Sequence, residues 1–123
     1  MSLKDKACAF LQLAASGNVQ TAYEKFIAPN FIHHNQYFKG DRQSLLTAME
    51  EAHKTSPNKP IEIKQTLEEG DKVMTHSLVS RQDSAQANIA VVHIFRFENN
   101  QIAELWDLGQ MIDVQSPNEN GMF

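Results

Sequence analysis

The spacing of apolar residues changes once along this chain, near Pro60. Before Pro60 the apolar residues recur every three or four positions, which is the period of an α-helix. After Pro60 they recur at every second position, which is the period of a β-strand. Helices that all precede the strands, with short connections between the strands, predict an α+β fold with a mostly antiparallel sheet. The helices must then cover one face of that sheet.

The residues before position 30 predict two helices. The first covers Leu3–Ala15, where apolar side chains share one face, and Gly17 is a good residue to end it. The second covers Val19–Ile27, with Asn18 as its N-cap. Pro29 prevents this helix from continuing much further, because proline has no backbone N–H to donate.

A third helix and four strands complete the predicted elements. Asp41 is expected to be the N-cap of this helix, and the proline-containing segment 56–60 ends it as a loop. The polar residues 83–87 are expected to form a connection. The strands are expected at 61–67, Val73–Val79, Ile89–Phe97 and Gln101–Ile112.

Length and charge limit the possible functions. The 123 residues fit one domain, which we take as residues 1–123. With 11 basic and 15 acidic side chains the net charge is −4, which argues against a nucleic-acid or anionic membrane surface as partner. No apolar run reaches the roughly 18 residues of a membrane helix, and the N-terminus lacks the apolar core of a signal peptide. The single cysteine allows no internal disulfide, and we expect a cytoplasmic protein.

The loop between the last two strands decides which of their residues share a face. A three-residue loop at 98–100, ending in a left-handed asparagine, predicts a type I turn followed by a bulge. This loop would pair Phe97 with Gln101, Phe95 with Ala103 and His93 with Leu105. Asp107 would then lie diagonal to His93, with roughly 7–8 Å between the two backbones. A two-residue turn would place Asp107 and His93 on opposite faces.

The two faces of these strands differ in composition. One face combines a histidine and an aspartate with apolar side chains, which is typical of a ligand cavity. Its members are His93, Phe95, Phe97, Ala103, Leu105 and Asp107. The opposite face is too apolar to be left in water, so we expect a homodimer in which a second copy of the sheet covers it. The members of this opposite face are Val92, Ile94, Arg96, Ile102, Glu104, Trp106 and Leu108.

Several short motifs occur in an order that is similar to that of one known family. They are FIHHN at 31–35, GD at 40–41, EGDKV at 69–73, IFRFEN at 94–99, IAELWD at 102–107 and NGMF at 120–123. Each motif alone is weak, but the ordered set is fairly specific. From about Ala22 to the C-terminus the chain resembles the SnoaL-like branch of the nuclear transport factor 2-like superfamily, which includes polyketide cyclases.

The resemblance implies both a shape and a reaction class. The shape is a cone, in which three helices pack in a curved, mostly antiparallel sheet around a hollow interior. The cyclases of this branch close a ring by intramolecular aldol condensation without metal or cofactor. A histidine and an aspartate act on the substrate in those enzymes, at places that look like His93 and Asp107 here. Only one of two adjacent histidines on an extended chain can face the cavity, and the resemblance selects His34, with Asn35.

Ring closure needs a base that removes a proton next to a carbonyl and a donor for the oxygen that becomes negative. Asp107 is the expected base, because burial in an apolar cavity raises the pKa of a carboxyl group toward neutrality. His93 would hold a proton for the oxyanion or orient the substrate carbonyl. The substrate would be a small hydrophobic carbonyl compound, and no cofactor is expected. The candidate ligand-binding residues are His34, Asn35, His76, Phe95, Leu105 and Tyr37.

Other interpretations fit the same residues. His93 and Asp107 could form a purely structural pair, and His34 with Asn35 could only hold the loop. His76 could be a donor in the pocket or an interior histidine bonded to Asn35. A metal could bind where three histidines, His34, His76 and His93, meet a carboxylate. The cavity could also serve a non-catalytic binding module, or be filled in a protein that only dimerises.

Overall fold

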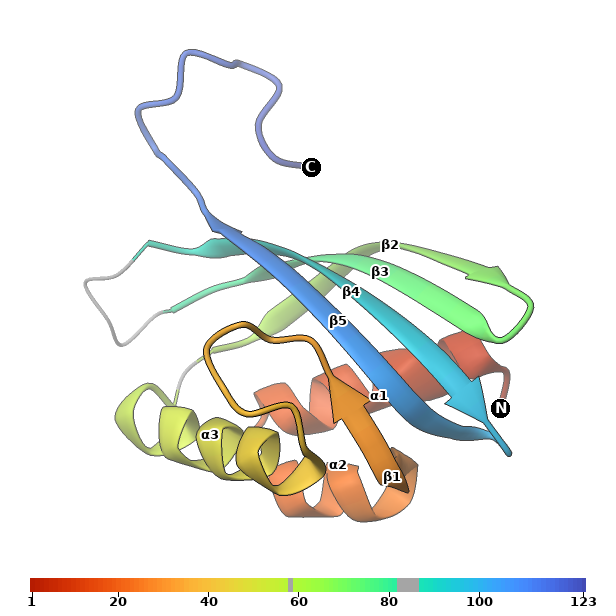
Figure 1. Cartoon of the computed structure of the whole chain (residues 1–123). Coiled ribbons are helices and arrows are strands. Elements are labelled where there is room, and N and C mark those ends of the chain that lie inside the picture. Colours follow the sequence, from red (N-terminus) through yellow and green to blue (C-terminus); the bar gives the residue numbers. More distant parts are fainter. Residues whose placement is uncertain (58, 82–86) are drawn as a thin grey trace.

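The computed structural model describes residues 1–57, 59–81 and 87–123. Helices and strands in these ranges follow the order shown in Figure 1. The helices are α1 (Leu3–Ala15), α2 (Val19–Phe26) and α3 (Arg42–Thr55), and the strands are β1 (Ile27–His33), β2 (Ile61–Glu69), β3 (Lys72–Val79), β4 (Ile89–Glu98) and β5 (Gln101–Met111). Within this described part of the chain, none of the helices is long and apolar enough to cross a membrane. The connection predicted at 83–87 lies, apart from Ala87, outside the described residues.

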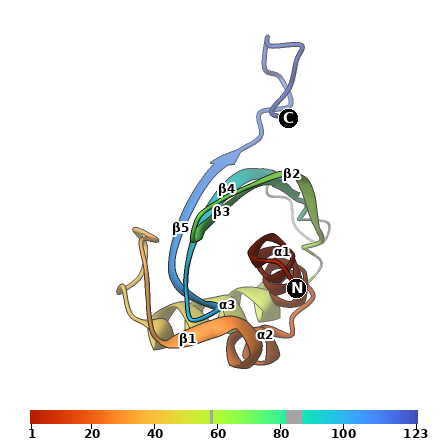
Figure 2. The ribbon, with the colours of Figure 1, turned by 90° about the vertical axis from the view of Figure 1, so that its right-hand side faces the viewer.

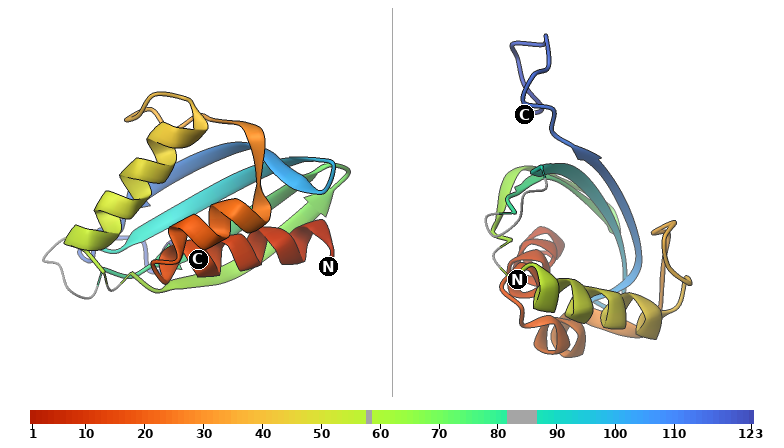
Figure 3. Two further views of the ribbon diagram at one scale, coloured as in Figure 1. Left: turned by 90° about the horizontal axis from the view of Figure 1, so that it is seen from below. Right: turned by 90° about the vertical axis from the view of Figure 1, so that its left-hand side faces the viewer.

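The strands form one curved sheet in the order β1-β5-β4-β3-β2. Strands β2 to β5 run antiparallel to their neighbours, whereas β1 joins the free edge of β5 in parallel. The sheet curls around α1, while α2 and α3 lie across the open side (Figure 2). Figure 3 shows from two further directions that the helices all lie on the concave side. The predicted α+β fold, with three helices in a curved and mostly antiparallel sheet, is confirmed.

Strand β1 corrects the prediction for the second helix. Helix α2 ends at Phe26, one residue earlier than expected, and the chain continues from Ile27 as a strand that had been missed. Pro29 explains the change, because proline cannot donate a helical hydrogen bond and pushes the residue before it into extended backbone. β1 lies at the edge of the sheet, where a proline in a strand is tolerated.

Side-chain hydrogen bonds determine where two of the helices begin. Asp41 caps α3 as predicted, accepting hydrogen bonds from the backbone N–H of Ser44 at 3.1 Å and from its hydroxyl at 2.6 Å. Ser2 and Asp5 form a capping box at the start of α1. Asn18 occupies the N-cap position of α2, but its side chain makes no capping hydrogen bond. The start of α3, and with it the end of the preceding loop, is therefore determined by local sequence.

The turn between β4 and β5 differs from the predicted one. It contains two residues, Asn99 and Asn100, with φ angles of 50° and 63°. Two successive positive φ angles define a type I′ turn. Phe97 therefore pairs with Ile102 instead of Gln101. The predicted three-residue loop and its pairings are wrong, because both asparagines, and not only the second, adopt the left-handed conformation.

A bulge in β5 compensates for the shorter turn. Arg96 faces Glu104, so Ala103 is an extra residue on the β5 side of the ladder. One extra residue reverses the face of every residue beyond it. His93 consequently lies directly opposite Asp107, where a diagonal placement had been expected. The prediction that these two residues share a face is therefore correct, although the three-residue turn on which it was based is wrong.

The hydrophobic core fills the space between the helices and the concave face of the sheet. Phe95 and Leu105 pair with each other and belong to this core, with 0% and 4% of their surfaces exposed. Ile102 is also fully buried there, so its predicted place on the outer face is wrong, and the bulge next to it accounts for the difference. Other large members of the core are Phe10, Leu11, Tyr23, Phe31, Leu45, Leu46, Val73 and Phe97.

The convex face of the sheet carries several apolar side chains. Ile94 and Trp106 pair with each other and alternate with the inward residues of β4 and β5. Leu67 of β2 and Met74 of β3 extend this patch and are 67% and 42% exposed. The four side chains line a shallow groove. The second copy of the sheet expected on this face stays a prediction.

Candidate functional site

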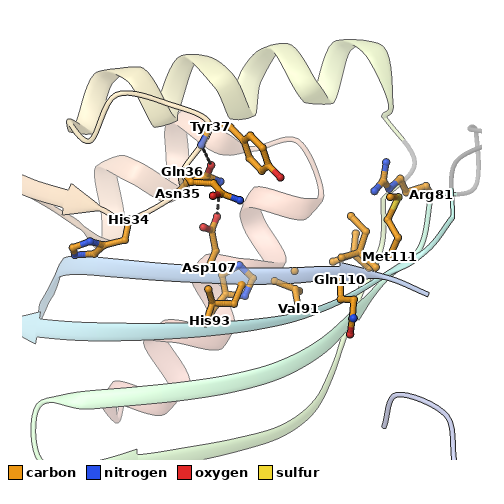
Figure 4. A pocket seen from close by; sticks show the side chains of 14 residues that line it. His34, Asn35, Gln36, Tyr37, Arg81, Val91, His93, Asp107, Gln110 and Met111 are labelled. Carbon is orange, nitrogen blue, oxygen red and sulfur yellow. Dashed lines mark hydrogen bonds between the residues drawn. The ribbon is translucent and has the colours of Figure 1, made fainter. Parts of the chain in front are cut away.

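A pocket of about 720 Å³ opens where β4 and β5 meet residues 34–40, the loop between β1 and the cap of α3 (Figure 4). Its lining also includes the last residue of β3, the first half of β4 and the second half of β5. The polar lining consists of His34, Asn35, Gln36, Tyr37, Arg81, His93, Asp107 and Gln110, and the apolar lining includes Val79, Ile89, Val91, Leu108 and Met111. A hollow in which apolar walls meet convergent polar groups is typical of a site for a small molecule.

Asp107 presents its two carboxylate oxygens to different surroundings. Its Oδ2 accepts a hydrogen bond of 2.9 Å from Nδ2 of Asn35, as the dashed line in Figure 4 marks. Its Oδ1 is buried and has no hydrogen-bond partner among the described residues. Buried polar atoms are nearly always paired, so this unpaired carboxylate oxygen makes Asp107 a candidate functional residue of the pocket.

His93 is the direct cross-strand neighbour of Asp107. Burial lowers the pKa of His93 to about 4, and the nearby charge of Asp107 opposes this shift only in part. The ring is therefore neutral at pH 7. Its Nδ1 is buried without a partner in the described part of the chain, where no hydrogen bond joins the ring to Asp107. A neutral imidazole donates one hydrogen bond and accepts one, so His93 is suited to orienting a carbonyl rather than to storing a proton.

His33 holds the loop that carries Asn35, although it was not among the predicted site residues. Only 5% of its surface is exposed. Its Nδ1 accepts the backbone N–H of Asn35 at 3.1 Å, which leaves Nε2 to donate to the carbonyl oxygen of Lys39 at 2.7 Å. Oδ1 of Asn35 in turn accepts the backbone N–H of Tyr37 at 3.0 Å. These bonds fix the amide of Asn35 so that its Nδ2 meets Asp107.

The predicted orientation of His34 into the cavity is wrong. Its ring stacks on Trp106, with 4.8 Å between the ring centres and 5° between the planes, and its Nε2 lies 2.6 Å from Oε2 of Glu104. His34 thus reaches only the edge of the pocket. The side-chain alternation of strand β1 predicts the correct orientation. Phe31 lies in the core, so His33 also points inward and His34 points outward.

Glu104 connects the loop 34–40 to the convex face of the sheet through hydrogen bonds. Its Oε2 bonds to His34, and its Oε1 accepts a hydrogen bond of 2.8 Å from Nε of Arg96. These bonds, first that of His34 and then that of Arg96, lower the pKa of Glu104. The loop is therefore held from both sides of the sheet, by His33 inside and by Glu104 outside.

His76 lies on the convex face and not in the cavity. Its Nδ1 is 2.9 Å from Nε2 of Gln65, and its ring lies 4.9 Å from the ring of Phe123. Both interpretations of His76, as a pocket donor and as an interior partner of Asn35, are therefore wrong. The considered set of three histidines does not converge either. Among the residues that the structure describes, no group of three or more potential metal ligands comes together.

The remaining predicted residues divide between pocket and core. Asn35 and Tyr37 line the pocket, and Tyr37 is 79% exposed at its mouth. Phe95 and Leu105, which were expected to contact the ligand, are core residues instead. Phe95 supports the site indirectly, because its ring stacks on His93 with 5.9 Å between the ring centres.

One protein family matches most of the sequence. The model of the SnoaL-like polyketide cyclases covers residues 6–116. The chain belongs to this family. The region that matches the SnoaL-like model contains the loop 34–40 and the β4-β5 hairpin, and therefore both His93 and Asp107. The resemblance inferred from the motifs is confirmed. No curated protein matches the sequence.

Solved structures share the fold of this SnoaL-like chain at low sequence identity. AclR from Streptomyces galilaeus, a proposed hydroxylase, is 20% identical, with a TM-score of 0.70 over 89% of this chain and 81% of its own. A cystatin-fold protein from Novosphingobium aromaticivorans is 18% identical, with a TM-score of 0.75 over 88% and 98% of the two chains. IdmH from Streptomyces antibioticus, a proposed polyketide cyclase, is 15% identical, with a TM-score of 0.73 over 89% and 93%. At these identities the likeness shows the fold alone.

Proposed function

We propose that this SnoaL-like protein is an acid–base enzyme that uses no cofactor and acts on a small hydrophobic carbonyl compound. The reaction would be an aldol-type cyclisation, an isomerisation or a dehydration. One observation supports this most strongly: Asp107, with its unpaired and buried Oδ1, stands beside a neutral His93 at a pocket that combines apolar walls with polar side chains.

In the proposed cyclisation, the carboxylate of Asp107 removes a proton from the carbon next to a substrate carbonyl. The electron pair of that C–H bond forms an enolate, whose oxygen accepts a hydrogen bond from the N–H of His93. The enolate carbon attacks a second carbonyl of the same substrate, which forms a C–C bond and an alkoxide. The proton on Asp107 then passes to the alkoxide, which restores the carboxylate. Asn35 fixes the orientation of the carboxylate by holding Oδ2.

The first step allows a test that does not need the natural substrate. The probe is an aryl alkyl ketone such as acetophenone in D₂O, and proton NMR follows the exchange of the protons next to its carbonyl. Asp107→Asn keeps the shape of the side chain but removes the base, so we expect the protein-catalysed exchange rate to fall by about 10² or more. Unfolding curves of both proteins show whether the fold survives the change.

Asp113→Asn is the matched control for this experiment. It removes a carboxylate that is exposed and accepts only the backbone N–H of Gln115, outside the pocket, so the exchange rate should not change. Exchange by Asp107→Asn at the wild-type rate would show that Asp107 is not the base. If ketones bind equally to both proteins and neither accelerates exchange, the pocket belongs to a non-catalytic binding module.

A further inference from the structure

A third polar side chain stands in line with His93 and Asp107. Thr75 of β3 is the direct cross-strand neighbour of His93, as Asp107 is on the other side, so the three residues form one row across three strands. Thr75 is 1% exposed, and its Oγ1 has no hydrogen-bond partner among the described residues. The mechanism proposed above gives this hydroxyl no role.

The hydroxyl of Thr75 and Nδ1 of His93 both lack a partner among the described residues, and the two residues are cross-strand neighbours. Directly opposite residues of an antiparallel pair have their Cβ atoms about 4.5–5.5 Å apart, so rotation of the Thr75 side chain can bring its hydroxyl to the ring. A buried polar group without a partner reduces stability, and one hydrogen bond would satisfy both atoms. His93 lines the pocket while its Nδ1 is buried, so Nε2 is the ring nitrogen available to a ligand.

We propose that Thr75 is a positioning residue whose hydroxyl donates to Nδ1 of His93 and thereby keeps the ring proton on Nε2, directed at the ligand. An imidazole that accepts through Nδ1 must carry its proton on Nε2. The catalytic meaning of this arrangement rests on the proposed function, because Nε2–H is the donor assigned to the enolate oxygen. The tautomer itself does not depend on any reaction.

The competing partner of Nδ1 is Oδ1 of Asp107, on the other side of the row. A bond from Nδ1–H to Oδ1 would leave the buried hydroxyl of Thr75 without a partner and would turn a bare Nε2 toward the pocket. A bond from Thr75 to Nδ1 leaves Oδ1 and Nε2–H unpaired and turns Nε2–H toward the pocket. Each arrangement leaves two groups of the row unpaired, but only the second presents a hydrogen-bond donor to a ligand, as the proposed function requires.

Long-range ¹H–¹⁵N NMR of the imidazole rings in the whole protein at pH 7 tests this inference, with the signals of His93 identified by their absence in His93→Gln. In the wild type, Nε2 should be protonated and Nδ1 bare. In Thr75→Val, which keeps the shape but not the hydroxyl, the Nδ1 signal should shift toward that of a protonated nitrogen. Thr75→Ser, which keeps a hydroxyl, should show the wild-type tautomer.

Ser77→Ala is the matched control on the same face of β3. Its hydroxyl is also buried and without a partner within the described residues, but Ser77 pairs with Val91 and not with a histidine. The His93 signals should therefore not change in this variant. A wild-type ring with its proton on Nδ1, or an unchanged tautomer in Thr75→Val, would overturn the inference.

The ketone-exchange assay separates this inference from the proposed function. Thr75→Val should lower the exchange rate by about tenfold at saturating ketone, with a small change in KM, because support of a catalytic group and not ligand contact is lost. A tautomer that depends on Thr75, together with full exchange activity in Asp107→Asn, would refute the function and leave the positioning role intact. An unchanged tautomer in Thr75→Val, together with a loss of exchange activity in Asp107→Asn, would refute the positioning role alone.

Discussion

His93 and Asp107 are adjacent, yet each keeps one buried polar atom without a partner in the described residues. No hydrogen bond joins these two side chains. Asn35 instead holds the far oxygen of the carboxylate. Unpaired buried polar atoms reduce stability, so their concentration beside one pocket supports the proposed role of this pair.

The low pKa of His93 predicts how stability depends on pH. The folded protein keeps this ring neutral down to about pH 4, whereas in the unfolded chain it takes up a proton near its ordinary value of 6.5. The unfolded state therefore binds more protons between these values, so His93 makes the protein less stable as pH falls from 6.5 to 4. Its contribution over this window is roughly 2–3 kcal/mol, and none of it is present above pH 6.5.

His93→Gln removes this group, and urea unfolding at several pH values measures the effect. We expect the free energy of unfolding of the variant, relative to the wild type, to increase as pH falls from 7 to 4. Parallel pH curves for the two proteins would contradict the neutral, buried state of the ring.

The β4-β5 hairpin is the element that decides the direction of Asp107. Its type I′ turn is one residue shorter than the predicted loop, and the bulge at Ala103 adds one residue back. Either change alone would turn Asp107 to the convex face. Arg96 and Glu104 support the resulting register, because they face each other across the strands and form a 2.8 Å hydrogen bond.

Gly17 lies in the turn between α1 and α2 and has a φ of 93°. The imidazole of His53 occupies the place that a Cβ at residue 17 would take. Gly17→Ala therefore combines a left-handed backbone with a collision, and we expect it to lower the free energy of unfolding by about 2 kcal/mol or more. Urea unfolding at pH 7 measures this loss.

Gly70→Ala is the matched control, because Gly70 has a φ of 60° and nothing lies within 4 Å of its added Cβ. It should cost about 1 kcal/mol, from the backbone strain alone. The difference between the two variants should shrink when both carry His53→Ala. Equal losses in Gly17→Ala and Gly70→Ala would mean that the contact with His53 has no energetic importance.

At the scale of the whole molecule, the sheet separates two surfaces with different properties. The concave side holds the core and the pocket, and the convex side exposes an apolar groove lined by Leu67, Met74, Ile94 and Trp106. Trp106 also stacks on His34, which precedes Asn35 in the loop 34–40. Apolar patches on a sheet face are typical of surfaces that another molecule covers.

The expected homodimer through this face leads to a prediction about assembly. Leu67→Glu combined with Met74→Glu places two charges in the exposed groove, so the dimer should dissociate while the fold persists. Sedimentation velocity measures the mass of the wild type and the variant. Gln20→Glu combined with Gln43→Glu adds the same charge on the helices and should leave the mass unchanged. A monomeric wild type at high protein concentration would exclude the dimer.

Local sequence determined the helices, the four antiparallel strands and the faces of β3. These features depend on hydrophobic period, on helix caps such as Asp41 and on glycine or asparagine in turns, which act over a few residues. The ordered motifs also identified the family. Residue types that suit acid–base chemistry pointed to His93 and Asp107 before their geometry was known, and their roles stay predictions.

Only the tertiary structure decided the remaining features. Strand β1 forms because β5 offers it an edge, and its alternation turns His33 inward and His34 outward. A single asparagine pair is compatible with two turns, and a bulge has no local signature, so packing in the core and across the sheet chose the register. His93 and Asp107 face each other because two irregularities cancel, which no local pattern in the sequence can reveal.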